Sequence, residues 1–430
     1  MSGFLDVPAV EVRAAGPLHG TLRAPSSKSL TNRALLVAAL AEGTSRLDSP
    51  LDSDDAQAMR VAISTLGATV EEAEGMLTVH GTGGDLVADG PVDARLSGTT
   101  MRFVAAAAAL SRRRVVVTGA APLLRRPVGP LTRALQQLGA TAADHDGFPP
   151  VAVGGGLSGG EITIDVSASS QYASALLLVA PYAARDVTVH ARGDAADAYI
   201  DLTVDLMRRW GADVEQPAAR TWTVRAGRHY VARNERVEYD ASAAAHLFTL
   251  AAATGGSVTV TNTAPRTLQP DARMVDALAA MGCTVVEEEA AVSVAGPDRL
   301  RAVDIDLTAM PDQVANIAVL AAVADGTTTI TGAAVTRGHE TDRLHALATE
   351  LTKAGVHVDE RDDGLVVTGG GATGDVRLDT YDDHRLAMAF AALAAAVDGI
   401  TIAEPGCVAK TYPGFWDDLV RLGGVVRTVA

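Results

Sequence analysis

Cationic and hydroxylic side chains recur in this sequence where apolar helices should begin. The first such stretch, "SSKSLTNRALLVAAL" from residue 26, carries Lys28, Ser29 and Arg33 ahead of a run of Ala, Leu and Val. A helix N-terminus presents free N–H groups and a partial positive charge, which favour anions. Burying Lys or Arg costs several kcal/mol per ion unless the ion is partnered. The pattern therefore indicates a site for an anionic ligand.

Five further stretches repeat this arrangement with other polar residues at the head. They begin near residues 96, 169, 240, 311 and 382, so that successive copies lie about 71 residues apart. Ser, Thr and Asp at such positions usually cap the helix, and each stretch alone is a weak signal. Because the heads recur together, we expect a shared ligand. The residues concerned are Gly98, Arg102, Ser169, Ser170, Gln171, Asp240, Asp312, Asp383, His384 and Arg385.

Other basic and acidic residues fit the same interpretation. Arg126 lies in "LLRRPVGPL", and Lys410 lies in "GCVAKTYPGF". The stretch "GHETDRLHAL" adds three more candidates, which are His339, Glu340 and Arg343. The acid–base candidates of the whole set are Asp312, Glu340 and Lys28, because a carboxylate among cations stays ionised and a Lys among Arg residues loses its proton more easily.

Metal and nucleotide motifs are missing. The sequence has no G-x-x-x-x-G-K-[ST] loop and no HExxH motif. The acids Asp54 and Asp55 in "LDSDDAQAM" are expected to cap a helix rather than to bind a metal ion. We therefore expect no metal site.

A second segment type interleaves with the first and positions these residues. It is an amphipathic helix followed by a glycine where a left-handed cap belongs and then by a short β-like run. The glycines are Gly67, Gly139, Gly211, Gly282, Gly355 and Gly423. The chain thus consists of six copies of one unit with two helices and several strands, enough for two globular domains of three copies each. A composition change around "RHYVARNERVEYDAS" predicts one domain from residues 1–24 plus 239–430 and another from residues 25–238.

Composition excludes several classes of protein. The 430 residues carry a formal net charge of −16, which argues against nucleic acid as a partner. No apolar run reaches the roughly 18 residues that span a bilayer, and the first residues do not resemble a signal peptide. The two cysteines, Cys283 and Cys407, are far apart and outside any CxxC pair. We expect no disulfide and no structural zinc, and a cytoplasmic location.

Eight motifs, in order along nearly the whole chain, resemble the 5-enolpyruvylshikimate-3-phosphate (EPSP) synthase family, the 3-phosphoshikimate 1-carboxyvinyltransferases. They are "PSSKSLTNRALL", "SGTTMRF", "RRPVGPL", "SASSQYASALLL", "AMPDQVA", "RGHETDRL", "TYDDHRLAMAF" and "AKTYPGF". The resemblance implies an α/β fold with two domains of three βαβαββ units each, an inside-out α/β barrel that closes over both substrates. It implies transfer of the enolpyruvyl group of phosphoenolpyruvate to shikimate 3-phosphate in aromatic amino acid biosynthesis. It implies no cofactor, and we expect a monomer.

The resemblance also implies a role for each matching residue. Asp312 would accept the proton of the 5-hydroxyl, while Glu340 and Lys28 would move the proton of the methylene carbon. Shikimate 3-phosphate would be held by Lys28, Ser29, Arg33, Ser169, Ser170, Gln171, Asp312 and His339. Phosphoenolpyruvate would be held by Lys28, Gly98, Arg126, Gln171, Arg343, Arg385 and Lys410.

Five positions depart from the family pattern. His339 stands where Lys is frequent, Val335 where Asn is frequent, and Ala196 where a Ser is expected. Leu96 and Phe103 flank "SGTTMR" in place of Asn and Pro. These departures bear on the affinity for shikimate 3-phosphate and on the response to the inhibitor glyphosate.

Two alternatives remain open at this point. The sister enzyme that transfers the same group to a UDP-aminosugar usually carries a reactive Cys in a loop at phosphoenolpyruvate, and neither cysteine is expected in such a loop. A non-catalytic anion-binding paralogue is favoured by His339, Val335 and Ala196. Retention of Lys28, Asp312 and Glu340 together with the cations argues against it.

Overall fold

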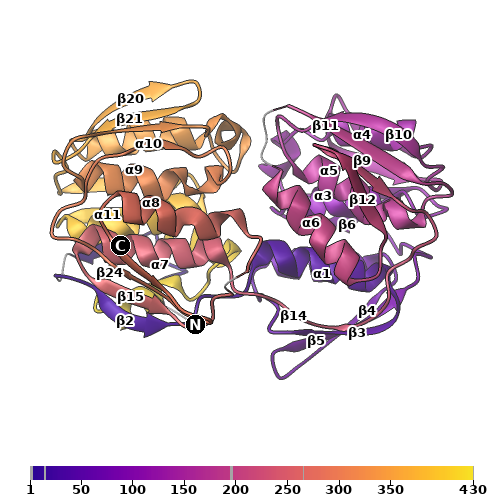
Figure 1. Ribbon diagram of the computed structural model, residues 1–430, viewed down its shortest axis with the longest axis horizontal. Helices are drawn as coiled ribbons and strands as arrows, with labels where there is room; N and C mark the ends of the chain where they lie inside the picture. Colours follow the sequence, from indigo (N-terminus) through magenta and orange to yellow (C-terminus); the bar gives the residue numbers. More distant parts are fainter. Residues whose placement is uncertain (1–2, 14–15, 194–196, 265, 430) are drawn as a thin grey trace. The chain divides into compact units, whose positions relative to one another are not determined.

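The computed structural model describes residues 3–13, 16–193, 197–264 and 266–429 (Figure 1). The chain divides into two compact units. Unit 1 consists of Met1–Pro25 and Glu238–Ala430, and unit 2 consists of Ser26–Val237. The chain therefore leaves unit 1 after its first strands and returns to it once unit 2 is complete.

The described residues form six four-stranded sheets with one common pattern, in which a parallel pair is followed by two antiparallel pairs. In unit 2 the strand orders are β14-β3-β5-β4, β6-β7-β9-β8 and β10-β11-β13-β12. The bounds are β3 (Glu42–Asp48), β4 (Thr69–Ala73), β5 (Met76–Thr82), β6 (Val92–Asp93), β7 (Val115–Thr118), β8 (Thr141–His145), β9 (Phe148–Gly154), β10 (Gly160–Asp165), β11 (Val187–Arg192), β12 (Val214–Ala218), β13 (Thr221–Val224) and β14 (Asn234–Arg236).

Unit 1 has the corresponding orders β2-β15-β17-β16, β18-β19-β21-β20 and β22-β23-β1-β24. The bounds are β1 (Ala9–Arg13), β2 (His19–Leu22), β15 (Ser257–Val260), β16 (Thr284–Glu287), β17 (Val292–Ala295), β18 (Asp304–Asp306), β19 (Thr327–Thr331), β20 (His357–Arg361), β21 (Gly364–Thr368), β22 (Val376–Leu378), β23 (Ile400–Ala403) and β24 (Val425–Val429).

Each unit is closed by strands that are distant in sequence. In unit 2 the last strand, β14, pairs in parallel with β3 and completes the first repeat. In unit 1 the N-terminal strand β1 lies between β23 and β24 and completes the last repeat. Both units are thus rings of three βαβαββ repeats, which confirms the expected fold class.

Two kinds of helix alternate along the chain. The apolar helices are α1 (Lys28–Leu40), α3 (Gly98–Ala108), α5 (Gln171–Val179), α7 (Ala241–Thr254), α9 (Val314–Val323) and α11 (His384–Ala396). The second kind comprises α2 (Asp54–Thr65), α4 (Gly129–Gln137), α6 (Ala198–Arg209), α8 (Met274–Ala280), α10 (Arg343–Lys353) and α12 (Phe415–Arg421). The glycine after each helix of the second kind has a positive φ, between 82° and 107°, so the expected left-handed caps are confirmed.

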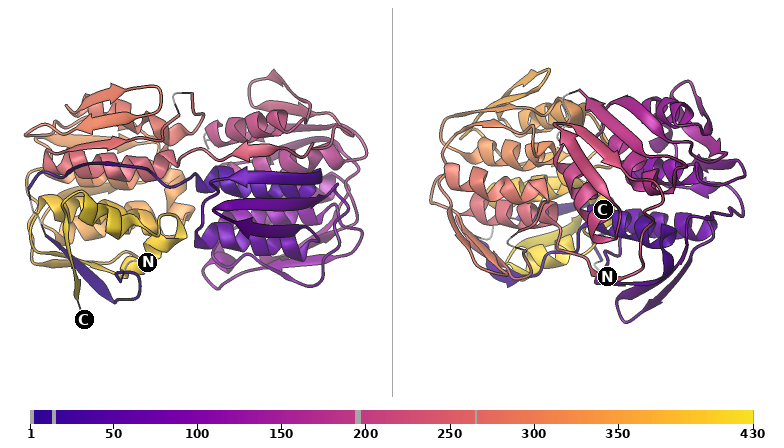
Figure 2. Two further views of the ribbon diagram at one scale, coloured as in Figure 1. Left: turned by 90° about the horizontal axis from the view of Figure 1, so that it is seen from below. Right: turned by 45° about the vertical axis from the view of Figure 1, so that its right-hand side comes forward.

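The apolar helices form the cores. In unit 1, α7, α9 and α11 pack on one another, and in unit 2, α3 packs on α1 and α5. Alanine-rich sequences permit this close approach, and α11 is almost completely buried from His384 to Ala395. Figure 2 shows the strands of each unit outside these helices. The polar heads of the apolar helices therefore lie at the ends of a dry core. Within the described residues, no helix is long and apolar enough to cross a membrane.

Candidate active site

Five segments of unit 1 bring charged side chains into one cluster. Asp312 lies in the 3₁₀ helix η4 (Pro311–Gln313), ahead of α9. Another 3₁₀ helix, η5 (Ala334–Gly338), leads to His339 and Glu340. The remaining members are Arg343 at the first position of α10, Asp383 and Arg385 at the head of α11, and Lys410 at the end of η6 (Pro405–Lys410).

Arg343 is the centre of this cluster. Its side chain is 1% exposed and donates to three carboxylates. Nε lies 2.7 Å from Asp383 Oδ2, Nη1 lies 2.7 Å from Asp312 Oδ1, and Nη2 lies 2.9 Å from Glu340 Oε2. Charge-assisted bonds of this kind are the strong ones in proteins, so Arg343 fixes the positions of all three acids.

Two further cations share those acids. Arg385 Nη2 donates to Asp312 Oδ2 at 2.9 Å, and Lys410 Nζ donates to Glu340 Oε1 at 2.7 Å. Asp312 and Glu340 thus each bridge two cations. Within the described part of this cluster, the three cations are balanced by three carboxylates before any ligand is bound.

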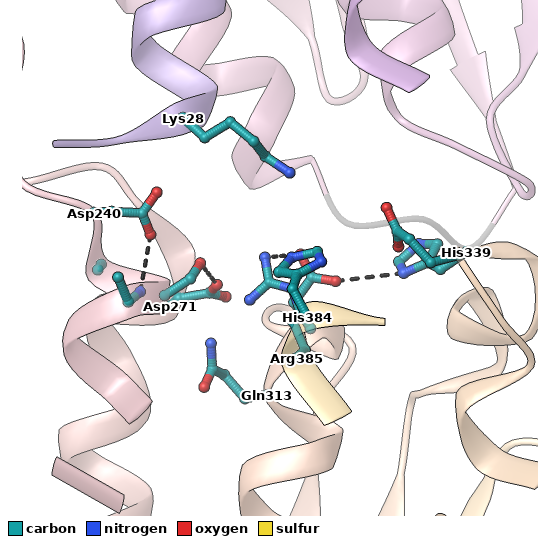
Figure 3. A network of polar contacts seen from close by, with 12 residues as sticks. Lys28, Asp240, Asp271, Gln313, His339, His384 and Arg385 are labelled. Atoms are coloured by element: carbon teal, nitrogen blue, oxygen red, sulfur yellow. Dashed lines mark hydrogen bonds and ion pairs between the residues drawn. The ribbon is translucent and has the colours of Figure 1, made fainter. Parts of the chain in front are cut away.

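The cations determine how Asp312 titrates. Burial alone would raise its pKa, but the positive charge of Arg385, a hydrogen bond with His339 and the positive charge of Arg343 outweigh burial and hold the pKa of Asp312 well below its usual range. His339, labelled in Figure 3, lies beside Asp312 and Arg343. Its Nδ1 is 3.4 Å from Asp312 Oδ1 and 3.1 Å from Arg343 Nη1. Burial lowers the pKa of His339 despite the opposing effect of Asp312. Asp312 is therefore an ionised base beside a neutral imidazole at pH 7.

The second group of candidates lies at the head of α1 in unit 2. Ser27 caps this helix, and Lys28 is its first residue. Lys28 Nζ lies 3.3 Å from Asp55 Oδ2, whose side chain is 4% exposed. The expectation that Asp55 caps a helix is wrong, because Ser53 caps α2 through its hydroxyl. Asp55 is the buried counter-ion of Lys28 instead.

Arg33 is directed into the fold of unit 2. Its guanidinium donates to Thr203 Oγ1 at 2.8 Å, to the Ser29 carbonyl at 3.0 Å and to the Tyr199 carbonyl at 3.2 Å. Phe103 stands at the position where the family often has Pro. Arg33 Cζ lies over its ring, 5.1 Å from the ring centroid. Burial lowers the pKa of Arg33 to about 10. These contacts tie α1 to α6.

The heads of α3 and α5 meet in the same unit. Arg102 Nη1 donates to Gln171 Oε1 at 2.7 Å, and Gln171 Nε2 donates to Thr99 Oγ1 at 3.3 Å. A Cβ added at Gly98 would lie 2.7 Å from Arg126 Nη1. Gly98 therefore leaves room for the Arg126 guanidinium beside the N-terminus of α3.

The remaining predicted positions are divided between the two units. The hydroxyl of Ser169 accepts from the backbone N–H of Gln171 at 3.3 Å, and Ser170 is the residue before α5. Leu96 is exposed beside the Ser97 cap, and Val335 is half-buried in η5. Ala196 lies outside the described residues.

Sequence reasoning paired neither of two acids with a cation: Asp383 was expected at the shared ligand, and Asp55 was expected to cap a helix. Asp383 holds Arg343, and Asp55 holds Lys28. For Asp55 the available signal was an acid in the first turn of a helix that already had a capping Ser, whereas Asp383 is itself the cap of α11 and gave no such signal. Within the described residues, no group of three or more His, Cys, Asp or Glu side chains could hold a metal ion.

The fold and this site define an enolpyruvyl transferase of the two-unit type. The structure superposes on EPSP synthase from Acinetobacter baumannii with a TM-score of 0.83, 27% identity and coverage of 97% of this chain and 99% of that one. It also matches the fold of the enolpyruvyl transferase NikO from Streptomyces tendae, with a TM-score of 0.79, 20% identity and 98% coverage of both chains.

The sequence comparisons agree. The model of the EPSP synthase (3-phosphoshikimate 1-carboxyvinyltransferase) family matches residues 12–419. The 3-phosphoshikimate 1-carboxyvinyltransferase of Methanoculleus marisnigri is 42% identical, covering 96% of this chain and 99% of the relative. That of Serratia proteamaculans is 38% identical, covering 97% and 99%. The chain belongs to the EPSP synthase family.

Proposed function

We propose that this protein transfers the enolpyruvyl group of phosphoenolpyruvate to the 5-hydroxyl of shikimate 3-phosphate and releases phosphate. Membership of the EPSP synthase family supports the reaction. The observation that carries it is the cluster in unit 1, where Arg343, Arg385 and Lys410 surround two carboxylates that can act as base and acid. Guanidinium and ammonium groups are the side chains best suited to phosphate and carboxylate groups.

The reaction proceeds by addition and elimination. The 5-hydroxyl oxygen bonds to C2 of phosphoenolpyruvate as its proton passes to Asp312, whose depressed pKa keeps it ionised at pH 7. The methylene carbon takes up a proton and becomes a methyl group in the tetrahedral intermediate. That methyl group then loses a proton as the C–O bond to phosphate breaks, which gives the enolpyruvyl ether. Glu340 is the proposed group for both transfers at this carbon, with Lys28 assigned to them by its motif.

The substrate contacts follow the motifs. We propose that the phosphoenolpyruvate anion is held by Lys28, Gly98, Arg126, Gln171, Arg343, Arg385 and Lys410. We propose that shikimate 3-phosphate is held by Lys28, Ser29, Arg33, Ser169, Ser170, Gln171, Asp312 and His339. Because Arg33 donates its N–H groups to protein acceptors, its proposed contribution is mainly to fix Ser29 and the head of α1.

Partners and location are part of the same proposal. We propose a monomer with small-molecule partners only, in the cytoplasm. The net charge of −16 supports the lack of a nucleic-acid partner. Both cysteines are free thiols, which suits a reducing compartment.

The sister reaction on a UDP-aminosugar is the competing function. A reactive cysteine needs a lowered pKa. Burial raises the pKa of Cys283 to about 11, and burial also raises the pKa of Cys407 well above its usual value. Neither thiol is therefore activated, which favours shikimate 3-phosphate as the acceptor.

The test is phosphate release from phosphoenolpyruvate in the presence of EDTA, with either shikimate 3-phosphate or UDP-N-acetylglucosamine as acceptor. Release with shikimate 3-phosphate alone is expected. Release with the UDP-sugar alone would replace the proposal by the sister reaction. Binding of shikimate 3-phosphate without release would identify a non-catalytic anion-binding protein.

A further inference from the structure

One buried carboxyl next to the cluster has no part in the reaction described above. Asp271 lies in the 3₁₀ helix η3 (Pro270–Arg273) and is 1% exposed. The hydroxyl of Ser242, in α7, donates to its Oδ2. No hydrogen bond within ordinary limits of distance and angle reaches its Oδ1 among the described residues, and the Gln313 amide is only a weak donor to this carboxyl. A buried carboxylate with too few hydrogen bonds is costly to keep ionised, so burial favours its protonated form.

The groups that face Asp271 come from three elements. Asp312 and Gln313 belong to η4, Arg385 belongs to α11, and Ser242 belongs to α7. Figure 3 shows Asp271, Gln313 and Arg385 pointing toward one another. Burial, followed by the negative charge of Asp312, raises the pKa of Asp271 to about 6, while Arg385, Ser242 and Gln313 oppose this rise.

The buried His246, which interacts electrostatically with Arg385 and Asp312, cannot supply a positive charge at pH 7. His246, in α7, is 1% exposed. Burial and then the charge of Arg385 lower the pKa of His246 to about 3. His246 is neutral at pH 7, so Asp271 is the group of the two whose protonation can change near this pH.

Binding of an anionic substrate is the event that should change the protonation of Asp271. Arg343, Arg385 and Lys410 are already paired with Asp312, Glu340 and Asp383. An anionic substrate at these cations adds negative charge in a region of low dielectric constant, where such charges interact strongly. The least costly compensation is to protonate the carboxyl whose pKa is already closest to neutral.

We propose that Asp271 is a positioning residue that takes up a proton when an anionic substrate binds to Arg343, Arg385 and Lys410. The inference rests on the proposed function. A solvent proton forms an O–H bond on Asp271, and no bond of the substrate is broken in this step. Neutral Asp271 then no longer attracts Arg385, so Asp271 no longer competes with the bound anion for this guanidinium, which keeps its bond to Asp312. Binding of the anion should therefore strengthen as the pH falls from 8 to 6.

The test measures protons taken up on binding. Phosphoenolpyruvate is titrated calorimetrically into the full-length protein at pH 7 in two buffers that differ in ionisation enthalpy. The wild-type protein is expected to take up most of one proton more than Asp271→Asn. The phosphate of the ligand and His339 also titrate, but they contribute in both proteins, so the difference isolates Asp271.

A matched control lies five residues away. Asp276 is 63% exposed and paired with Arg273, and Asp276→Asn should take up as many protons as the wild-type protein. Ser242→Ala gives a second prediction with a defined sign. Because the Ser242 hydroxyl lowers the pKa of Asp271, its removal should shift the pH of maximal proton uptake upward.

The outcomes separate this inference from the proposed function. Equal proton uptake by the wild-type protein and Asp271→Asn, in an enzyme that releases phosphate, overturns the inference alone. Uptake that depends on Asp271 in a protein that releases no phosphate supports the inference for anion binding and overturns the proposed reaction. A wild-type protein that takes up no proton with phosphoenolpyruvate and releases no phosphate with shikimate 3-phosphate overturns both.

Discussion

Replacing Asp383 by Asn should destabilise unit 1 more than any comparable surface change. Asp383 is fully buried, and its two oxygens receive Arg343 Nε at 2.7 Å and Nη2 at 3.3 Å. Oδ1 also accepts the backbone N–H of Arg385 at 2.9 Å, which caps α11. Asn keeps the shape and an oxygen for the cap, but it removes the charge opposite a buried guanidinium.

The magnitude follows from the partners that Arg343 retains. Removing one partner of a buried ion pair costs about 3–5 kcal/mol. Arg343 keeps Asp312 and Glu340, but these are shared with Arg385 and Lys410, so we expect about 3 kcal/mol for Asp383→Asn. Asp383→Ala also removes the helix cap and should cost about 1 kcal/mol more.

Urea unfolding followed by tryptophan fluorescence measures this loss. Trp416 is the one tryptophan of unit 1 and is completely buried. The control is Asp342→Asn, because Asp342 likewise caps a helix, α10, and pairs with an arginine, Arg337, at 2.9 Å. Those side chains are 40% and 27% exposed, so the control should lose less than about 1 kcal/mol. Equal losses for the two variants would refute the assignment of Asp383 as the buried anchor of Arg343.

Three further changes test other parts of the structure. Asp312→Asn should lower kcat by about 10²- to 10⁴-fold with substrate binding mostly kept, and a near-normal kcat in the phosphate-release assay would rule Asp312 out as the base. Gly98→Ala should displace Arg126, because the new Cβ would lie 2.7 Å from Arg126 Nη1. It should raise KM for phosphoenolpyruvate about 10- to 100-fold with little change in stability. An unchanged KM would count against Arg126 as a ligand of phosphoenolpyruvate. His246 is charged below pH 6.5 when unfolded but stays neutral to about pH 3 when folded, so stability is lost as the pH falls. Between pH 6.5 and pH 5 the wild-type protein should lose about 2 kcal/mol more of its free energy of unfolding than His246→Gln, as measured by urea unfolding. Equal losses in the two proteins would contradict the conclusion that His246 is buried and neutral.

The sequence alone determined the repeat, the alternation of two helix types and the glycine caps. These features depend on signals within a few residues of one another: apolar spacing, a capping side chain, or a glycine such as Gly139 that adopts a positive φ. The same local signals marked Lys28, Asp312 and Arg385 as polar heads on apolar helices. They needed no knowledge of the neighbouring repeats.

Only the tertiary structure decided which groups act on one another. The pairing of β14 with β3 joins segments at opposite ends of unit 2, and the Arg343–Asp383 pair joins residues 40 positions apart. Asp55 shows the limit of local reasoning, because a first-turn acid has the same sequence signature whether it favours the helix N-terminus or neutralises a buried lysine. The charge states of Asp271 and His246 depend on burial and on charges carried by other repeats. Desolvation and Coulomb interactions act through space, so they become defined only when the repeats have packed together.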